Sequence, residues 1–309
     1  MDGREYEYDM GGCRLKYRAQ PEGICVCGCQ GRAGTVTVPE RIEGKPVTAI
    51  DRKAFLSRKN LREIRLPLSL RSIGDWAFAY CDGLERITIP SECSHMGRAI
   101  FLDCGRLECV AGVCSGEDGP GTFGEAWTPE CGRLLAGAVT QLEAYYLLEP
   151  SQVGSREWLE KWDARLEAVM RTPDQEGYSR QVLCGEEDYG STDMNAFLQA
   201  KRQKKVRLAM LRLLCDEGLS DGMRTHLEGY LTSHTKGCES EECWQVVLEE
   251  GETRPEYARL FLRLGCANRE NMEEMIGQMG EEQPQLRAAF LRYQQERLGH
   301  ADFFAGLSL

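Results

Sequence analysis

Metal binding is the first chemistry that the residues of this sequence suggest. The 309 residues include 15 cysteines, and Cys25, Cys27 and Cys29 alternate with other residues in the stretch CVCGC. Thiolates that share one zinc ion converge on it at Zn–S distances of about 2.3 Å. Residues i and i+2 of a straight strand lie roughly 6.5 Å apart, and zinc sites more often use CxxC spacing. We therefore expect these cysteines to form an inward-facing, apolar strand surface, with a metal site as the open alternative.

Catalysis is the second possibility, and the sequence motifs give it little support. The chain contains four histidines, and none lies in an HExxH motif. GxSxG, a P-loop and a dinucleotide-binding fingerprint are also absent from the sequence. A Cys–His pair assembled from distant parts of the chain stays open, because catalytic neighbours need not be neighbours in sequence. The sequence predicts a protein that is not an enzyme and uses no cofactor.

The composition predicts an acidic, soluble protein of the cytoplasm. Hydrophobic residues make up 42% and charged residues 28% of the chain, and the net charge is −11 at pH 7. This charge disfavours binding to nucleic acid or to an anionic membrane. The opening stretch MDGREYEYDMGG has no apolar run typical of a signal peptide, and no run of about 18 apolar residues could span a membrane. We expect mostly reduced cysteines, and the oligomeric state stays open.

The elements that would position these side chains follow from an internal repeat. Residues 61–83 and 84–106 are two copies of one pattern. The identical pairs are Leu61/Leu84, Ile64/Ile87, Pro67/Pro90, Gly74/Gly97, Phe78/Phe101 and Cys81/Cys104. A period in the low twenties is typical of a solenoid, whose coils bury the same positions in stacked rows. Ile50 and Phe55 extend the register upstream, and Leu107 and Val110 extend it downstream.

The repeat resembles the BspA-like leucine-rich-repeat family, whose repeats read roughly LxxIxIPxxVxxIGxxAFxxCxx. The matching residues are Leu61, Ile64, Leu66, Pro67, Ile73, Gly74, Ala77, Phe78 and Cys81, and a weaker copy begins at Leu84. The resemblance covers residues 34–113 and implies a short β-solenoid of three to four coils. It also implies binding or adhesion rather than one particular reaction. Cys93 and Ile100 depart from the pattern.

Side chains on the outer face of the predicted coils form the candidate binding surface. Alternation along the stretch REIRLP directs Ile64 inward and Glu63 and Arg65 outward. The full set of candidates is Thr35, Thr37, Glu63, Arg65, Arg86 and Thr88. Strands spaced about 4.8 Å apart make this face only roughly 15 Å wide, which is less than a standard protein interface uses. The alternative interpretation is that these residues only keep a short sheet soluble.

Beyond residue 113 the pattern changes. Glycines within residues 114–129 predict a linker. Further on, apolar residues recur at helical spacing, as Trp158, Trp162 and Leu166 illustrate. Short turns between helices of about a dozen residues indicate antiparallel hairpins, which resemble a degenerate ankyrin- or HEAT-like repeat. The basic stretch KRQKKVR at residues 201–207 is suited to phosphate binding, but we expect it to be the solvated end of a partly buried helix.

Together these features predict an α+β protein with two domains. The predicted parts are an N-terminal β-hairpin cap at 1–33, a leucine-rich-repeat solenoid at 34–113, a glycine-rich linker at 114–129 and an α-helical repeat domain at 130–309. The predicted function is a non-catalytic protein–protein interaction or scaffold module, with a composite surface from both domains and an unidentified protein partner. The open alternatives are a cell-surface adhesin or glycan-binding protein whose leader is missing, and an uncharacterised enzyme.

Overall fold

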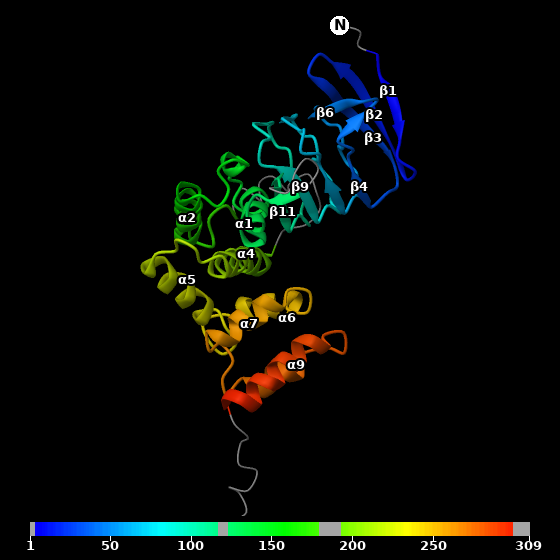
Figure 1. The fold of residues 1–309 in the computed structure, drawn as a ribbon. Helices are drawn as coiled ribbons and strands as arrows, with labels where there is room; N and C mark the ends of the chain where they lie inside the picture. The colour runs from blue at the N-terminus through cyan, green and yellow to red at the C-terminus, as the bar shows by residue number, and fades with distance from the viewer. Residues whose placement is uncertain (1–3, 117–122, 179–192, 299–309) are drawn as a thin grey trace, which may run out of the picture. The chain divides into compact units, whose positions relative to one another are not determined.

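Short parallel strands stack into the solenoid that the repeat predicts (Figure 1). The computed structural model describes residues 4–116, 123–178 and 193–298. One sheet has the strand order β1-β2-β3-β6-β8-β10, with β5 paired to β6, and the other has the order β12-β11-β9-β7-β4. The strands are β1 (Tyr6–Asp9), β2 (Cys13–Gln20), β3 (Gly23–Gly31), β4 (Thr35–Thr37), β5 (Arg41–Ile42), β6 (Lys45–Ile50), β7 (Glu63–Arg65), β8 (Ser72–Ile73), β9 (Arg86–Pro90), β10 (His95–Met96), β11 (Cys109–Ser115) and β12 (Phe123–Glu125).

Rows of equivalent side chains fill the interior of the coils. The rings of Phe55 and Phe78 stack with their centroids 5.1 Å apart, and those of Phe78 and Phe101 stack 5.9 Å apart. Ile64 and Ile87, which occupy the same position in successive coils, have no exposed surface. A single coil cannot bury its own apolar face, so each row needs the coil on either side of it. The repeat seen in the sequence is therefore the core of the solenoid.

The N-terminal strands extend the first sheet. β1, β2 and β3 pair antiparallel, and β3 then pairs parallel with β6. The register of β2 and β3 shifts at Cys27, which has no partner on β2 and forms a β-bulge. The bulge places Cys29 opposite Leu15 and Cys25 opposite Arg18, on the two different faces of the sheet. The expectation that three cysteines share one inward surface is therefore wrong, because the extra residue reverses the alternation.

Strand β12 and the helix after it close the other end of the solenoid. β12 pairs antiparallel with β11, and helix α1 (Pro129–Thr140) packs on β11. The Nε1–H of Trp127 donates to the carbonyl oxygen of Val110 over 2.9 Å. The Trp127 ring lies directly over Gly112, where any larger residue would collide with it. Residues 123–129 of the predicted linker thus form part of a cover on the last coil.

A second helix completes this end of the chain's first unit. After the short 3₁₀ helix η1 (Tyr145–Leu147) comes α2 (Arg156–Arg171). The indole of Trp158 donates to Leu147 over 2.9 Å, and that of Trp162 donates to Leu134 on α1 over 3.0 Å. Both rings are buried. The helical spacing of these tryptophans is therefore a core pattern, as expected.

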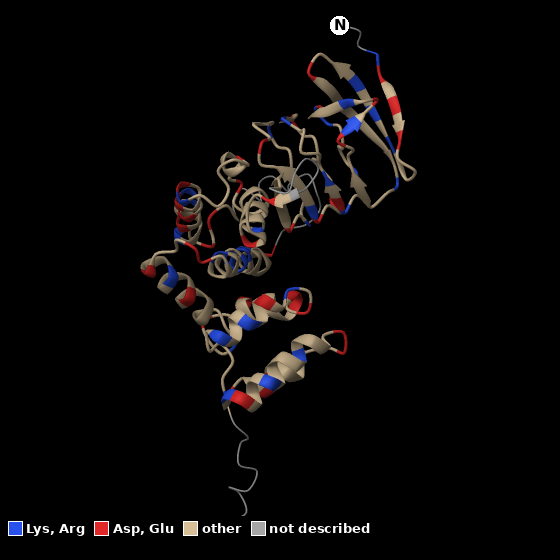
Figure 2. Ribbon diagram, in the orientation of Figure 1, with Lys and Arg blue, Asp and Glu red and all other residues tan. Residues whose placement is uncertain are grey.

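The contacts divide the chain into two compact units, Met1–Val169 and Met170–Leu309. This grouping places α1 and most of α2 with the solenoid, whereas the sequence predicts a division at 114–129. That the solenoid and the helical half are separate domains with those bounds stays a prediction. Figure 2 shows acidic and basic residues spread over many elements of each unit, so the net charge of −11 is not gathered on one element.

The second unit is helical. Its helices are α4 (Met194–Leu214), α5 (Asp221–Ser233), α6 (Glu242–Glu250), α7 (Pro255–Arg263), α8 (Met272–Gln278), α9 (Pro284–Tyr293) and a π-helical turn, η2 (Gln294–Leu298). Trp244, Phe261 and Phe290 form an aromatic core with ring centroids 5.5 to 6.1 Å apart. A helical half is thus present, and a regular repeat within it stays a prediction. None of the helices in the described ranges is long and apolar enough to cross a membrane.

Candidate binding surface

The six candidate residues lie in register on neighbouring strands of the second sheet. Parallel pairing aligns Thr35 with Glu63 and Glu63 with Arg86 in one cross-strand row. A second row aligns Thr37, Arg65, Thr88 and Ala111. The residues between them, such as Ile64 and Ile87, point into the core. The alternation rule therefore predicted correctly which side chains share the outer face, and their role in binding stays a prediction.

A groove crosses these strands and has a volume of about 580 Å³. This is within the range of about 300–1,000 Å³ that is usual for ligand sites. We call it the strand groove, and the residues that line it are Thr37, Val38, Pro39, Glu40, Glu63, Arg65, Leu66, Pro67, Arg86, Thr88, Ala111 and Val113. All of the candidates except Thr35 are among them. The groove thus spans β4, β7, β9 and β11.

The order of the rows gives the strand groove two different sides. The row Thr37–Arg65–Thr88–Ala111 runs along its middle. Glu63 and Arg86, two positions earlier on their strands, lie on one side of that row. On the other side, Pro39, Pro67 and Val113 lie two positions later. One side is therefore ionic, and the other is mainly apolar, with the Glu40 carboxylate next to Pro39 and Pro67.

The carboxylates of the strand groove already have partners. Glu40 accepts hydrogen bonds from the backbone N–H groups of Leu68 and Ser69 over 2.7 and 3.3 Å. Glu63 pairs with Arg65 at 3.0 Å. Arg86 is exposed and has no carboxylate within 4.0 Å among the described residues. Among the described residues, Arg86 is therefore the charged side chain of the groove that has neither a charged nor a backbone partner.

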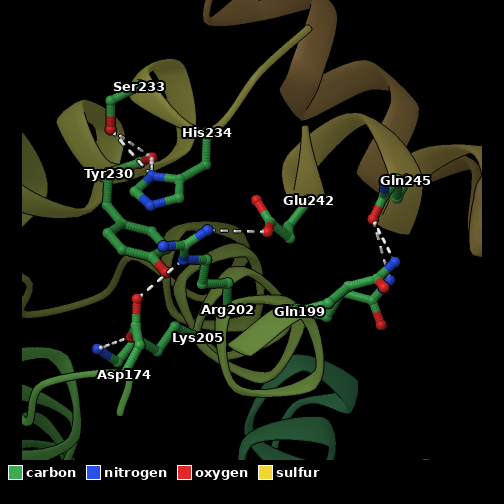
Figure 3. A network of polar contacts seen from close by, with 10 residues as sticks. Asp174, Gln199, Arg202, Lys205, Tyr230, Ser233, His234, Glu242 and Gln245 are labelled. Atoms are coloured by element: carbon green, nitrogen blue, oxygen red, sulfur yellow. Dashed lines mark hydrogen bonds and ion pairs between the residues drawn. The ribbon is translucent and has the colours of Figure 1, made fainter. Parts of the chain in front are cut away.

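Part of the basic stretch of α4 is paired with carboxylates within the second unit (Figure 3). Asp174 accepts from Arg202 Nε over 2.9 Å and from Lys205 Nζ over 2.7 Å. Arg202 also reaches Glu242 on α6, at 3.4 Å. Lys205 is 7% exposed, so the expectation that this stretch is the solvated end of a partly buried helix is wrong at this residue. The carboxylate that permits its burial is far away in sequence, which is why the stretch KRQKKVR alone does not indicate it.

Two polar atoms of this network lack partners among the described residues. They are the hydroxyl of Tyr230 and the Oε2 atom of Glu242, and both are buried. The ring of Tyr230 stacks on that of His234 with centroids 4.0 Å apart (Figure 3). Burial raises the pKa of Tyr230 well above its ordinary value, and the charges of Asp174 and Glu242 add to the effect. The network joins α4, α5 and α6 through ion pairs and a stacked ring pair, so we assign it to stability.

The repeated cysteines of the coils, Cys81 and Cys104, are buried thiols of the core. No three side chains of His, Cys, Asp or Glu in these ranges gather closely enough to hold a metal ion. The Sγ atoms of Cys81 and Cys104 lie 3.1 Å from the carbonyl oxygens of Phe55 and Phe78. Burial raises the pKa of the Cys81 thiol to about 11 and that of Cys104 to about 12. Both are thus neutral thiols at pH 7, and a thiol is a weak nucleophile.

Comparison with known protein families agrees with the geometry of the coils. Residues 36–111 match the profile of the BspA type leucine rich repeat region, in six copies. This segment is a BspA-type leucine-rich repeat region. The match covers the strands and turns that form the strand groove, from Val36 to Ala111. Repeats of this kind are generally binding modules.

Three solved structures are similar to part of the chain. A leucine-rich repeat protein from T. pallidum is 30% identical, with a TM-score of 0.32, and the match covers 34% of this chain and 49% of that one. A leucine-rich cell surface protein from Faecalibacterium prausnitzii is 23% identical, with a TM-score of 0.31 and coverage of 35% and 30%. A leucine-rich repeat protein from Bacteroides ovatus is 25% identical, with a TM-score of 0.30 and coverage of 34% and 29%. The chain spans less than half the length of each of these chains. No curated protein matches it.

Proposed function

We propose that this chain is a non-catalytic protein-binding module and that the strand groove is its binding site. The observation that carries the proposal is the alignment of polar side chains from three neighbouring strands, β4, β7 and β9, around one hollow of about 580 Å³. Exposed side chains that only served solubility would not need to line a hollow. A groove with a few polar groups and an apolar side is the usual form of a binding site.

The size of the strand groove sets the kind of binding. Four strands spaced about 4.8 Å apart give a groove roughly 15 Å long. A standard protein interface uses about 20–30 residues from each partner, and the groove offers twelve. We therefore infer that it takes a short segment of a partner rather than a broad folded surface. A cytoplasmic location, which the sequence also predicts, stays a prediction.

Filling the strand groove tests the proposal. In the variant Thr37→Tyr/Thr88→Tyr, two large rings occupy the middle row, while tyrosine remains favourable in strands. The matched control is Thr225→Tyr, because Thr225 is exposed on α5. All three full-length proteins serve as baits in lysate of the native cell, and mass spectrometry quantifies what each captures. We expect a partner that the wild type and the control retain and that the groove variant loses. Equal capture by all three proteins would contradict the assignment of the groove.

A further inference from the structure

The uncompensated charge in the strand groove points to a particular kind of partner. Resting on the proposed function, we propose that the strand groove binds an extended peptide segment in which an acidic residue directly adjoins an aliphatic one. The acidic side chain pairs with Arg86, and the aliphatic side chain lies on Pro39, Pro67 and Val113. The proposal therefore names the residue types of the bound segment as well as its binding site.

The acidic residue of the partner follows from which charged side chains of the groove are already paired. Glu40 is occupied by two backbone N–H groups, and Glu63 is occupied by Arg65. That leaves the exposed guanidinium of Arg86, a planar donor that suits a carboxylate in a two-point contact. The hydroxyl of Thr88 belongs to the adjacent middle row and offers a further donor. A basic peptide would face the same free guanidinium and gain no free carboxylate in return.

The order of the rows determines the spacing between the acidic and the aliphatic residue of the bound segment. In an extended segment, successive side chains point to opposite sides of the backbone. A segment that follows the middle row therefore sends one side chain toward Arg86 and the next toward the apolar side. At about 3.3 Å per residue, a groove roughly 15 Å long holds four to five residues. An acidic residue directly followed or preceded by an aliphatic one therefore fits the groove, whereas a spacing of i and i+2 would send both side chains to the same side.

The lining of the groove favours a peptide over a glycan or a nucleic acid. None of its twelve residues is aromatic, so it offers no flat ring for stacking a sugar or a base. The chain's net charge of −11 opposes a polyanion. A single carboxylate on a short segment meets mainly the nearby charges, Arg86 and the Glu63–Arg65 ion pair, because more distant charges are screened beyond about 8 Å at physiological ionic strength.

Selection from a peptide library tests the inference. Random octapeptides displayed on phage are selected on the immobilised full-length chain, on Arg86→Glu and on Arg106→Glu. Arg106 is an exposed arginine outside the strand groove and serves as the matched control. We expect the wild type and the control to enrich Asp or Glu next to Leu, Ile or Val. We expect Arg86→Glu to lose this preference and to select Lys or Arg at the same position.

The affinity of one enriched peptide, made synthetically, then measures how much Arg86 contributes to binding. Losing a hydrogen-bonded charge pair should weaken its affinity for Arg86→Glu by roughly 10- to 100-fold, with no loss for Arg106→Glu. A version of the peptide with Lys in place of the acidic residue should bind Arg86→Glu better than it binds the wild type. Equal affinity of the original peptide for the wild type and Arg86→Glu would overturn the inference, as would a library that enriches no acidic residue or no peptide at all.

The groove-filling variant separates this inference from the proposed function. If peptides lose binding to Thr37→Tyr/Thr88→Tyr but not to Arg86→Glu, the strand groove binds peptides without the acidic preference, and only the present inference fails. If neither variant weakens binding and lysate capture is also unchanged, the groove is not the binding site and both proposals fail.

Discussion

At the scale of single residues, the glycine that recurs at one position of two successive coils cannot be replaced by a larger residue without a clash. A Cβ atom added to Gly74 would lie 2.5 Å from the backbone nitrogen of Arg52 and 2.8 Å from the carbonyl carbon of Asp51. Backbone atoms of a neighbouring coil cannot move aside as a flexible side chain can. The same position in the next coil is Gly97, which is equally crowded by the backbone of the coil before it. The glycine of the repeat is thus a packing requirement between coils.

We predict that Gly74→Ala lowers the free energy of unfolding by about 2 kcal/mol, as overpacked sites do. The midpoint of urea unfolding, followed by circular dichroism, measures the change. Gly105→Ala is the control, because a Cβ there meets nothing within 4 Å. A stable Gly74→Ala protein would show that the coils separate more easily than their contacts indicate.

Asp174 is the residue whose ionisation matters to the helical unit. Burial alone would raise its pKa, but the hydrogen bonds from Lys205 and Arg202 outweigh burial and hold the pKa below its ordinary value of 3.8. A carboxyl group with a lowered pKa stabilises the folded state above its ordinary pKa. That contribution is lost as the pH falls through the lowered value.

We predict that Asp174→Asn lowers the free energy of unfolding by roughly 2 kcal/mol at pH 7, because Lys205 stays buried without its carboxylate. The difference between variant and wild type should shrink as the pH falls below about 4. Thermal unfolding of both proteins from pH 7 to pH 2.5 measures it. A difference that stays constant over this range would mean that the ion pairs do not contribute.

At the scale of elements, the cover on the last coil depends on one indole. The Nε1–H of Trp127 satisfies the carbonyl of Val110, and its ring fills the space over Gly112. We predict that Trp127→Phe lowers the free energy of unfolding by about 1–3 kcal/mol, since it leaves a buried carbonyl without a donor. Chemical unfolding measures the effect. Trp127→Phe combined with Gly112→Ala should not restore the loss, because added volume does not replace a hydrogen bond.

The sequence predicts some elements well and others poorly, for a physical reason. The coils repeat, so the inward positions at Ile64 and Ile87 and the outward positions at Arg65 and Thr88 follow from local alternation. The cover formed by β12 and α1 does not repeat, and its glycines resemble a linker until pairing with β11 is seen. The bulge at Cys27 is equally invisible, because it depends on the register with β2.

The candidate site shows the same division. Sequence periodicity identifies Glu63, Arg65 and Arg86 as members of one face, because a strand alternates strictly. It does not show that Glu63 is already paired with Arg65 and that Arg86 is free of carboxylate partners among the described residues. Side-chain pairing on a surface depends on rotamers that no periodicity encodes. The apolar side of the strand groove was likewise not predicted, although Pro39 and Pro67 are visible in the repeat.

At the scale of the whole molecule, the boundary of the folded first unit decides which fragments are stable. The solenoid predicted from sequence ends at residue 113, but β12, Trp127 and α1 cover its last coil. We predict that a fragment of residues 1–171 unfolds cooperatively on heating, whereas a fragment of residues 1–113 aggregates or shows no cooperative transition, because an uncovered terminal coil exposes apolar surface. Differential scanning calorimetry of both fragments distinguishes these outcomes. Two equally cooperative fragments would instead support the predicted division at 114–129.

The predicted composite surface of the two halves stays a prediction at this scale. Capture by the whole chain and by the two fragments 1–171 and 172–309 would test it. A partner held by the whole chain and by neither fragment would support a composite surface. Retention by 1–171 alone would assign binding to the solenoid unit.

The closed ends of the solenoid make its length adjustable. The N-terminal strands pair with the first coil, and β12 and α1 pack on β11 after the last full coil, so residues 84–106 lie between the two covered ends. Duplicating those residues would insert one more strand and lengthen the strand groove by about 4.8 Å. The length of the solenoid thus changes in steps of one 23-residue coil. The ion pair between Arg62 and Glu85, which are 23 residues apart, links two successive coils. A groove lengthened in this way would bind a partner segment that is longer by one or two residues.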